Sequence, residues 1–201
     1  MFVLGVRVSN TPGAVDDATA TTALYLIISA LRQFSKAERA LRKGEWKSNL
    51  NSGRAFDLTD KTLAILGMGG IGTRIAELAH TFPMRVIYHN RRPAEKAPSW
   101  AEYYPKEQLT EFLKKADVLA ISVPLNQETE GLVGKDMIGQ LKKGAFIVNT
   151  ARGKVVDEDA MIEALKSGHV CQPAIPFVLP LTDRPRSWEV WVWMCTQTSL
   201  M

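Results

Sequence analysis

The sequence predicts an α/β protein whose core is a doubly wound parallel sheet. Short apolar runs at residues 62–66, 85–89, 117–123 and 145–149 alternate with segments of helical pattern, as in parallel sheets covered by helices. A glycine-rich turn joins the first run directly to the helix that follows it. With 46% hydrophobic and 23% charged residues among 201, the chain has the composition of a globular protein with a full core.

The segment before the sheet is expected to be mainly helical. Residues 2–8 are predicted as a short strand, ended by a turn of Asn10, Thr11, Pro12 and Gly13. Residues 14–34 favour a long helix, residues 36–46 a shorter polar helix and residues 49–59 a loop. The long helix has an apolar face at helical spacing, and we expect this face to exceed what the short strand can cover. Its members are Leu24, Ile27, Ile28 and Leu31.

The remaining helices are expected between and after the strands, at residues 71–81, 106–115, 135–141 and 157–167. From residue 170 an irregular tail is predicted, because its prolines exclude a helix or a central strand. The tail also carries tryptophans whose spacing fits neither helix nor strand. The residues concerned are Pro173, Pro176, Pro180, Pro185, Trp188, Trp191 and Trp193.

Composition excludes several classes of partner. The 25 Lys and Arg against 21 Asp and Glu give a net charge of +4. The sequence lacks the stripe of basic residues with interleaved aromatics that is typical of nucleic-acid binding. Cys171 and Cys195 lack CxxC spacing, so neither a disulfide framework nor a metal site is expected. The longest apolar run, residues 23–31, is much shorter than the ~20 residues of a membrane span. Without a visible targeting signal, we expect a cytoplasmic protein.

The turn after residues 62–66 has the spacing G-x-G-x-x-G. In such a turn the first glycine permits a tight bend, the second lets the backbone approach a pyrophosphate, and the third allows the helix to pack closely on the strand. The helix N-terminus attracts the anion. A plain glycine-rich turn is the alternative, but the preceding strand and following helix favour a Rossmann-like dinucleotide-binding domain. The turn comprises Gly67, Met68, Gly69, Gly70, Ile71 and Gly72.

The end of the next strand indicates which dinucleotide is preferred. An acidic residue there would accept a hydrogen bond from the ribose 2′-OH of NAD, yet the sequence has Asn90, Arg91 and Arg92. Two guanidinium groups suit the 2′-phosphate of NADP. We therefore expect NADP to be preferred over NAD, the alternative being that both arginines are merely solvated. The histidines, His80, His89 and His169, are expected to be structural.

Several motifs resemble the D-isomer-specific 2-hydroxyacid dehydrogenases, over about residues 5–169. They are the turn at residues 10–13 with the helix after it, the glycine motif, and Ser122-Val123-Pro124-Leu125 followed by Thr129, Gly131 and Leu132. The most specific is Lys142-Lys143-Gly144-Ala145-Phe146-Ile147-Val148-Asn149-Thr150-Ala151-Arg152-Gly153. The segment at residues 90–92 is similar to the glyoxylate and hydroxypyruvate reductase branch, in which NADP is favoured.

The resemblance implies a role for each matching residue. Arg152 matches the catalytic arginine that binds the carboxylate and carbonyl of a 2-oxo acid, as a guanidinium fork can. Residues 68–71 match the pyrophosphate loop, and Thr150 and Ala151 match the stretch beside the nicotinamide. Val123, Pro124 and Thr129 match the wall of the cofactor cleft. The helix at residues 14–34 matches one that packs across a two-fold homodimer interface; without a partner it is an aggregation liability.

The resemblance also divides the chain. Residues 1–13 correspond to a remnant of a substrate domain and a hinge, residues 14–169 to the NAD(P)-binding domain, and residues 170–201 to no part of the family. The family's Glu–His proton donor has no match, so we expect this chain alone to be inactive. One alternative is a non-catalytic, NAD(H)-sensing corepressor or binding module. A methyltransferase is a weaker alternative, disfavoured by the run at residues 149–153.

The codons of the tail suggest why it departs from the family. Read from the third base, the codons of residues 188–200 permit Gly-Gly-Val-Gly-Leu-Asp-Val-Tyr-Pro-Asn-Glu-Pro, which resembles the missing family segment. A retained intron between Val170 and Ser187 would shift the frame in this way. The alternative is a genuine tryptophan-rich C-terminus with its own binding role.

Overall fold

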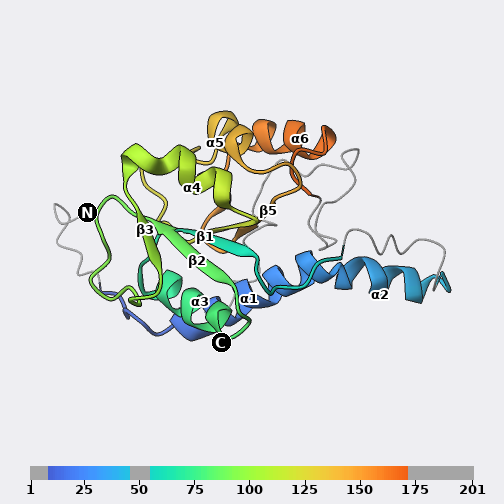
Figure 1. Ribbon diagram of the computed structural model, residues 1–201, viewed down its shortest axis with the longest axis horizontal. Coiled ribbons are helices and arrows are strands. Elements are labelled where there is room, and N and C mark those ends of the chain that lie inside the picture. The colour runs from blue at the N-terminus through green and yellow to red at the C-terminus, as the bar shows by residue number, and fades with distance from the viewer. Residues whose placement is uncertain (1–8, 46–54, 172–201) are drawn as a thin grey trace.

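A computed structural model describes residues 9–45 and 55–171 of the chain. The strand expected at residues 2–8, the first part of the loop expected at residues 49–59, and the tail from residue 172 lie outside the described residues. The rest forms a parallel sheet of five strands between two layers of helices, as Figure 1 shows. The fold class predicted from the sequence is therefore confirmed.

The sheet has the strand order β3-β2-β1-β4-β5, and all pairs are parallel. The four predicted strands are present as β1 (Thr62–Leu66), β2 (Arg85–His89), β4 (Val118–Ile121) and β5 (Phe146–Asn149). The edge strand β3 (Glu102–Tyr104) was not predicted. It has three residues, which is too short to produce a periodic pattern, and it exists through pairing with β2.

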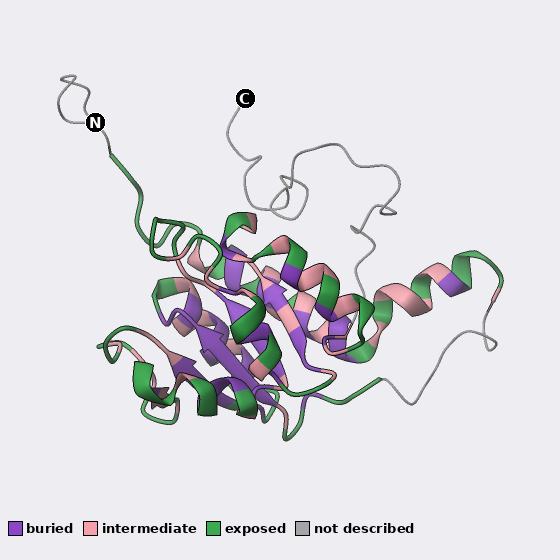
Figure 2. Ribbon diagram, turned by 90° about the horizontal axis from the view of Figure 1, so that it is seen from above, coloured by how far each residue is buried: buried purple, intermediate pink, exposed green. Residues whose placement is uncertain are grey.

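Alternation along the strands divides the core into two halves. In β1, Leu63 and Ile65 face one half, whereas Ala64 and Leu66 face the other, because successive strand side chains point to opposite faces. The same alternation runs through β4. Figure 2 shows the central strands buried beneath the outer helices. A sheet buried on both faces explains the continuous apolar runs of the sequence.

Each half of the core is closed by its own helices. α1 (Asp16–Arg32) and α3 (Gly70–His80) cover one face of the sheet, and α4 (Leu109–Lys115), α5 (Lys135–Gln140) and α6 (Glu158–Lys166) cover the other. The helix expected at residues 106–115 is instead a 3₁₀ turn, Lys106–Gln108, followed by α4. A second 3₁₀ turn, Gly153–Val155, follows β5.

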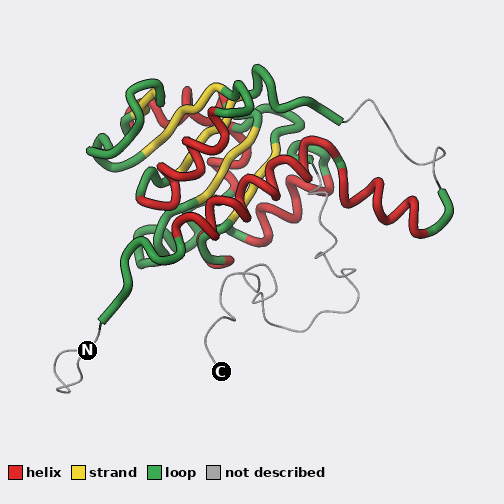
Figure 3. The backbone as a smooth tube through the Cα atoms, turned by 90° about the horizontal axis from the view of Figure 1, so that it is seen from below, coloured by secondary structure: helices red, strands yellow, loops and turns green. Residues whose placement is uncertain are grey.

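The helical segment before the sheet breaks earlier than expected. Gln33 adopts a left-handed backbone with φ 57°, and its N–H bonds to the Ser29 carbonyl, which closes α1 as a left-handed C-cap. A second helix, α2 (Phe34–Arg42), starts at once. The predicted boundaries at residue 34 and at residues 36–46 were therefore wrong. Figures 1 and 3 show α2 extending away from the sheet.

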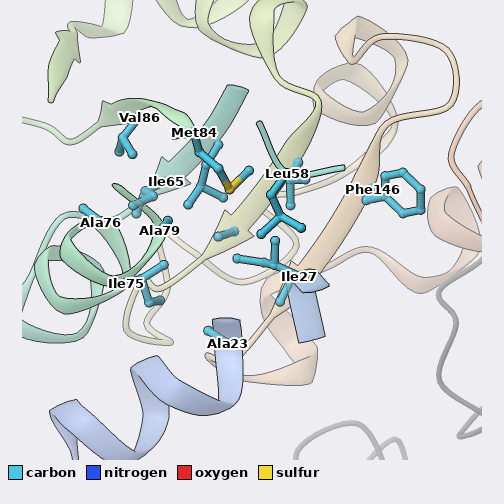
Figure 4. Close-up of a cluster of buried hydrophobic side chains, with 14 of the residues drawn as sticks. Ala23, Ile27, Leu58, Ile65, Ile75, Ala76, Ala79, Met84, Val86 and Phe146 are labelled. Atoms are coloured by element: carbon cyan, nitrogen blue, oxygen red, sulfur yellow. The ribbon is translucent and has the colours of Figure 1, made fainter. Parts of the chain in front are cut away.

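The apolar face of α1 is covered only in part. Ile27 and Leu31 are 0% and 1% exposed, because they pack with α3 and the sheet, whereas Leu24 and Ile28 are half-buried. Figure 4 shows Ile27 near Leu58, in the cluster that also contains Ile65 and Phe146. Other apolar side chains of α1 and α2, and of the residue just before α1, remain more than half exposed. They are Val15, Tyr25, Phe34 and Leu41.

Candidate functional site

The motifs singled out from the sequence meet at one edge of the sheet. The glycine turn follows β1, residues 90–92 follow β2, residues 122–129 follow β4 and residues 150–152 follow β5. Carboxyl ends of parallel strands share an edge, and the strand order reverses between β1 and β4. Ligands of open α/β sheets bind in the crevice at this reversal. The candidate site therefore lies across the carboxyl ends of these strands.

The glycine turn is held by contacts that exclude side chains. Gly67 has φ +103°, and a Cβ there would lie 2.7 Å from the Ser122 carbonyl oxygen. A Cβ at Gly72 would collide with the carbonyl oxygen of Gly67. Positive φ and this close helix–strand approach each require glycine. These two residues therefore act as the sequence motif predicts.

Open space lies where a phosphate would approach. Apart from Gly69 itself and its two chain neighbours, no atom of the described residues lies within 4 Å of a Cβ built at Gly69. Gly69 is the N-cap of α3, and its carbonyl accepts the N–H of Thr73 at 2.8 Å. The first amides of such a helix point outward and favour an anion. The turn therefore leaves room for an anion at Gly69, while the Asp16 carboxylate lies against the neighbouring Gly70.

Asn90 braces this turn from the neighbouring strand. Its Oδ1 accepts the N–H of Met68 at 2.7 Å, and its Nδ2 donates to the Met68 carbonyl at 3.4 Å. The Met68 side chain is itself buried, at 3% exposure. Both residues therefore have support roles here: Asn90 bonds the turn, and the side chain of Met68 belongs to the core.

The two arginines after β2 differ in their partners. Arg91 Nη1 donates to Glu128 Oε2 at 2.9 Å, with both side chains largely exposed. Within residues 9–45 and 55–171, Arg92 has no ion pair. The sequence analysis missed Glu128. No sequence pattern links this loop residue to Arg91, which is 37 positions earlier in the chain. An acidic side chain, absent from the end of β2, thus reaches Arg91 from the loop after β4.

The loop after β4 is closed by its own side chains. Thr129 Oγ1 donates to the Pro124 carbonyl at 2.6 Å. Asn126 Oδ1 accepts the N–H groups of Glu128 at 2.9 Å and of Thr129 at 3.1 Å. Such local side-chain bonds hold a loop in one conformation. Val123 lies beside the glycine turn, its Cγ1 being 2.8 Å from the position of a Cβ on Gly67.

The turn after β5 presents a cation. Asn149 Oδ1 accepts the N–H of Ala151 at 2.9 Å, and its Nδ2 donates to the Arg152 carbonyl at 3.0 Å. Thr150 joins this turn to β4 through its N–H, 3.4 Å from the Ile121 carbonyl. The exposed Arg152 guanidinium donates to the Ala151 carbonyl at 2.9 Å. It forms no ion pair with any described carboxylate, so a bound acid can take that role.

Each histidine has a structural contact. His80 stacks on Trp100 with ring centroids 3.9 Å apart. His89 Nδ1 lies 2.8 Å from the Tyr104 carbonyl, and His169 Nε2 lies 3.0 Å from the Ile138 carbonyl. Among the described residues there is no cluster of His, Cys, Asp and Glu suited to a metal ion. No helix in this part of the chain is long and apolar enough to span a bilayer.

A family model and curated proteins are similar to this chain. The model for the D-isomer specific 2-hydroxyacid dehydrogenase NAD binding domain matches residues 24–175. A glyoxylate reductase of Aeropyrum pernix is 41% identical over 181 residues, which is 86% of this chain and 52% of that protein. 4-Methyl-2-oxopentanoate reductase A of Aspergillus oryzae is 42% identical over 167 residues, which is 83% and 49%. The chain spans about half the length of these relatives.

A solved structure shares the same architecture. The crystal structure of a glyoxylate reductase from Paecilomyes thermophila aligns with a TM-score of 0.76 at 41% identity. The alignment covers 84% of this chain and 50% of that chain.

Proposed function

Because the chain belongs to the D-isomer specific 2-hydroxyacid dehydrogenases through their NAD-binding domain, we propose that it binds a nicotinamide dinucleotide across the carboxyl edge of its sheet. In its whole protein, this domain serves the reduction of a small 2-oxo acid of the glyoxylate or hydroxypyruvate type to a D-2-hydroxy acid. The observation that carries the proposal is the glycine turn: Gly67 and Gly72 cannot hold a side chain, and Gly69 opens onto free space.

Residues 14–169 are the proposed nucleotide-binding unit. The amides of residues 68–71 at the start of α3 would hold the pyrophosphate. Val123, Pro124 and Thr129 form the wall after β4, and Thr150 and Ala151 border the nicotinamide end. For the tail from residue 170 we retain the out-of-frame interpretation, which an in-frame spliced transcript would support.

Arg91 and Arg92 support a preference for NADP. Both lie at the end of β2, where no carboxylate of β2 competes for a ribose hydroxyl. A guanidinium pairs with phosphate through two parallel hydrogen bonds. Arg92 is free of ion pairs among the described residues and Arg91 is held only by an exposed one, so both can turn to a 2′-phosphate.

Arg152 is the proposed substrate-binding and catalytic residue. Its guanidinium can hold the carboxylate of a 2-oxo acid and stabilise the charge that develops on the carbonyl oxygen. The bound dinucleotide supplies a hydride to the carbonyl carbon. The oxygen must then receive a proton, and the histidines of this chain are engaged in structural contacts. We therefore propose that the chain alone binds cofactor without turnover.

Those same histidine contacts favour one alternative, a non-catalytic module that senses NAD(H). The two functions differ in the whole protein. If the function is enzymatic, a chain as long as the relatives should turn over a 2-oxo acid although this chain alone does not. If the function is sensing, both the short and the long chain should bind NAD(H) without turnover.

Titration with cofactors tests the proposed function. Fluorescence titration of the purified chain is expected to show binding of both NADPH and NADH, with NADPH bound more tightly. The double variant Arg91→Ala/Arg92→Ala should lose about tenfold or more in NADPH affinity, since each charge-assisted bond contributes about 1.5–3 kcal/mol. NADH affinity should change little. Equal affinity of the wild type for both cofactors would refute the NADP preference, and no binding of either would refute the function.

A further inference from the structure

The ion pair between Arg91 and Glu128 joins two loops across the candidate site. Arg91 follows β2 and Glu128 lies in the loop after β4, whereas β1 lies between these strands in the sheet. The pair therefore bridges the carboxyl end of the strand that carries the glycine turn. Its Nη1–Oε2 distance is 2.9 Å.

The position of Glu128 is built into its loop. Asn126 Oδ1 accepts the N–H of Glu128 itself, and Thr129 Oγ1 closes the loop on the Pro124 carbonyl. These bonds hold the backbone of Glu128 beside the arginine whether or not the side chains are paired. A negative charge thus stays near Arg91 when Arg91 turns elsewhere.

We propose, on the premise of the function given above, that Glu128 is a determinant of cofactor choice that limits the preference for NADPH. The 2′-phosphate carries a charge of roughly −1.5 to −2 near neutral pH. To bind it, Arg91 must give up Glu128, and the carboxylate that remains nearby repels the phosphate. The 2′-OH of NADH carries no charge and meets neither penalty.

In the opposite role, Glu128 would orient Arg91 for the phosphate. The solvent exposure of both side chains disfavours this role. The side chains are 85% and 70% exposed, and an exposed pair contributes only about 0.2–1 kcal/mol. Such a pair orients the Arg91 guanidinium only weakly. The carboxylate of Glu128, however, keeps its full negative charge near the phosphate. Charge repulsion therefore dominates, and its effect falls as salt screens it.

The experiment compares Glu128→Gln with Glu130→Gln, a matched variant on the same loop whose carboxylate pairs with Lys154 at 3.7 Å. Glu128→Gln should lower the Kd for NADPH about two- to fivefold at low ionic strength and change that for NADH less than about twofold. The gain should shrink at high salt, and part of it should persist in the Arg91→Ala background, because the carboxylate still repels a phosphate when its arginine partner is gone. Glu130→Gln should leave both constants unchanged.

The outcomes separate this proposal from the one on which it rests. If the wild type binds both cofactors but Glu128→Gln leaves the NADPH Kd unchanged or raises it, the role of Glu128 is refuted and the proposed function stands. An equal gain in Glu130→Gln would also refute it, because the effect would then be one of net charge. A wild type that binds neither cofactor refutes both proposals.

Discussion

At the residue scale, the glycine turn shows how a missing side chain sets geometry. Gly67 is constrained by its backbone, whose φ of +103° a residue with a Cβ rarely adopts. Gly72 has ordinary helical geometry, but it packs directly on the carbonyl oxygen of Gly67. The first glycine bends the chain and the second allows α3 to approach β1. Together they determine where the first amides of α3 point.

Replacing Gly72 with alanine should therefore destabilise the domain. The new methyl group collides with backbone, which cannot move aside as a flexible side chain can, and overpacking of this kind costs about 1–3 kcal/mol. We expect Gly72→Ala to lower the midpoint of thermal unfolding and to weaken binding of NADPH and NADH alike.

Gly139 provides the matched control for that prediction. It lies within α5, and no atom comes within 4 Å of a Cβ built there. Gly139→Ala should leave stability unchanged or raise it by about 0.5–1 kcal/mol, because alanine favours helix. Equal midpoints for Gly72→Ala and the wild type in differential scanning calorimetry would contradict the packing argument.

At the element scale, the edge strand β3 is held by a network of charged and phenolic groups. Glu102 accepts the Tyr104 hydroxyl at 2.6 Å and Arg85 at 2.5 Å. Lys115 donates to the Tyr104 oxygen at 2.5 Å and pairs with Glu111 at 2.7 Å. The bonds from Tyr104 and Arg85 lower the pKa of Glu102. Those to Glu111 and Tyr104 raise the pKa of Lys115 to about 12.

The lowered pKa of Glu102 predicts a pH-dependent contribution to stability. A carboxylate whose folded pKa lies below its unfolded value of about 4.3 stabilises the fold above that value and loses the effect as pH falls through the folded pKa. The difference in unfolding midpoint between the wild type and Glu102→Gln should be positive at neutral pH and should diminish as the pH falls below the unfolded pKa of about 4.3 and through the lowered folded pKa.

The size of this difference should be modest, because the Glu102 side chain is 44% exposed. Glu107→Gln is a suitable control, since Glu107 lies on the adjacent 3₁₀ turn and forms no ion pair among the described residues. A Glu102 difference that persists unchanged at low pH would show that the carboxylate does not act through its charge.

At the scale of the whole molecule, the exposed side chains of α1 and α2 favour a homodimer. Tyr25, Phe34 and Leu41 are each more than half exposed, and α2 extends beyond the sheet (Figure 3). An apolar surface of this kind is typical of an interface or an aggregation site. We propose that a second copy of the chain covers these side chains. Of the α1 face expected from the sequence to form the interface, Ile27 and Leu31 are instead buried within the chain.

Light scattering on dilute protein tests this arrangement. The wild type should give the mass of a dimer, and Phe34→Glu/Leu41→Glu should give a monomer, because two charges would have to be buried in the interface. Lys43→Glu, an exposed change just after α2, should leave the dimer intact. A stable wild-type monomer would contradict the proposal.

The purified chain is also expected to show no reduction of glyoxylate or hydroxypyruvate with NADPH. Arg152 can hold a 2-oxo acid, but no described group is placed to protonate its oxygen. Absorbance of NADPH measures this directly, with bound cofactor confirmed by fluorescence in the same sample. Turnover above background would show that a proton donor had been overlooked, and a positive control from an active relative keeps a null result interpretable.

Much of the fold and of the candidate site could be predicted because the signals are local. Four of the five strands follow from apolar runs, since a strand buried on both faces is apolar along most of its length. The glycine turn follows from its spacing and its place between strand and helix. Parallel strands bring their carboxyl ends to one edge, and the segments that contain Gly67, Arg91 and Arg152 follow strands of this sheet.

Other features depended on contacts between residues distant in sequence. β3 exists because β2 pairs with it, and Ile27 is buried because α3 and the sheet meet α1. Asn90 bonds to Met68 from the next strand, and Glu128 reaches Arg91 across β1. By itself, the sequence determined which segments form strands and which residues can carry the chemistry, because backbone preference and hydrophobic spacing act over a few residues. Only the tertiary structure decided which of those residues are partners, because hydrogen bonds and ion pairs act over a few ångströms of space, whatever the separation along the chain.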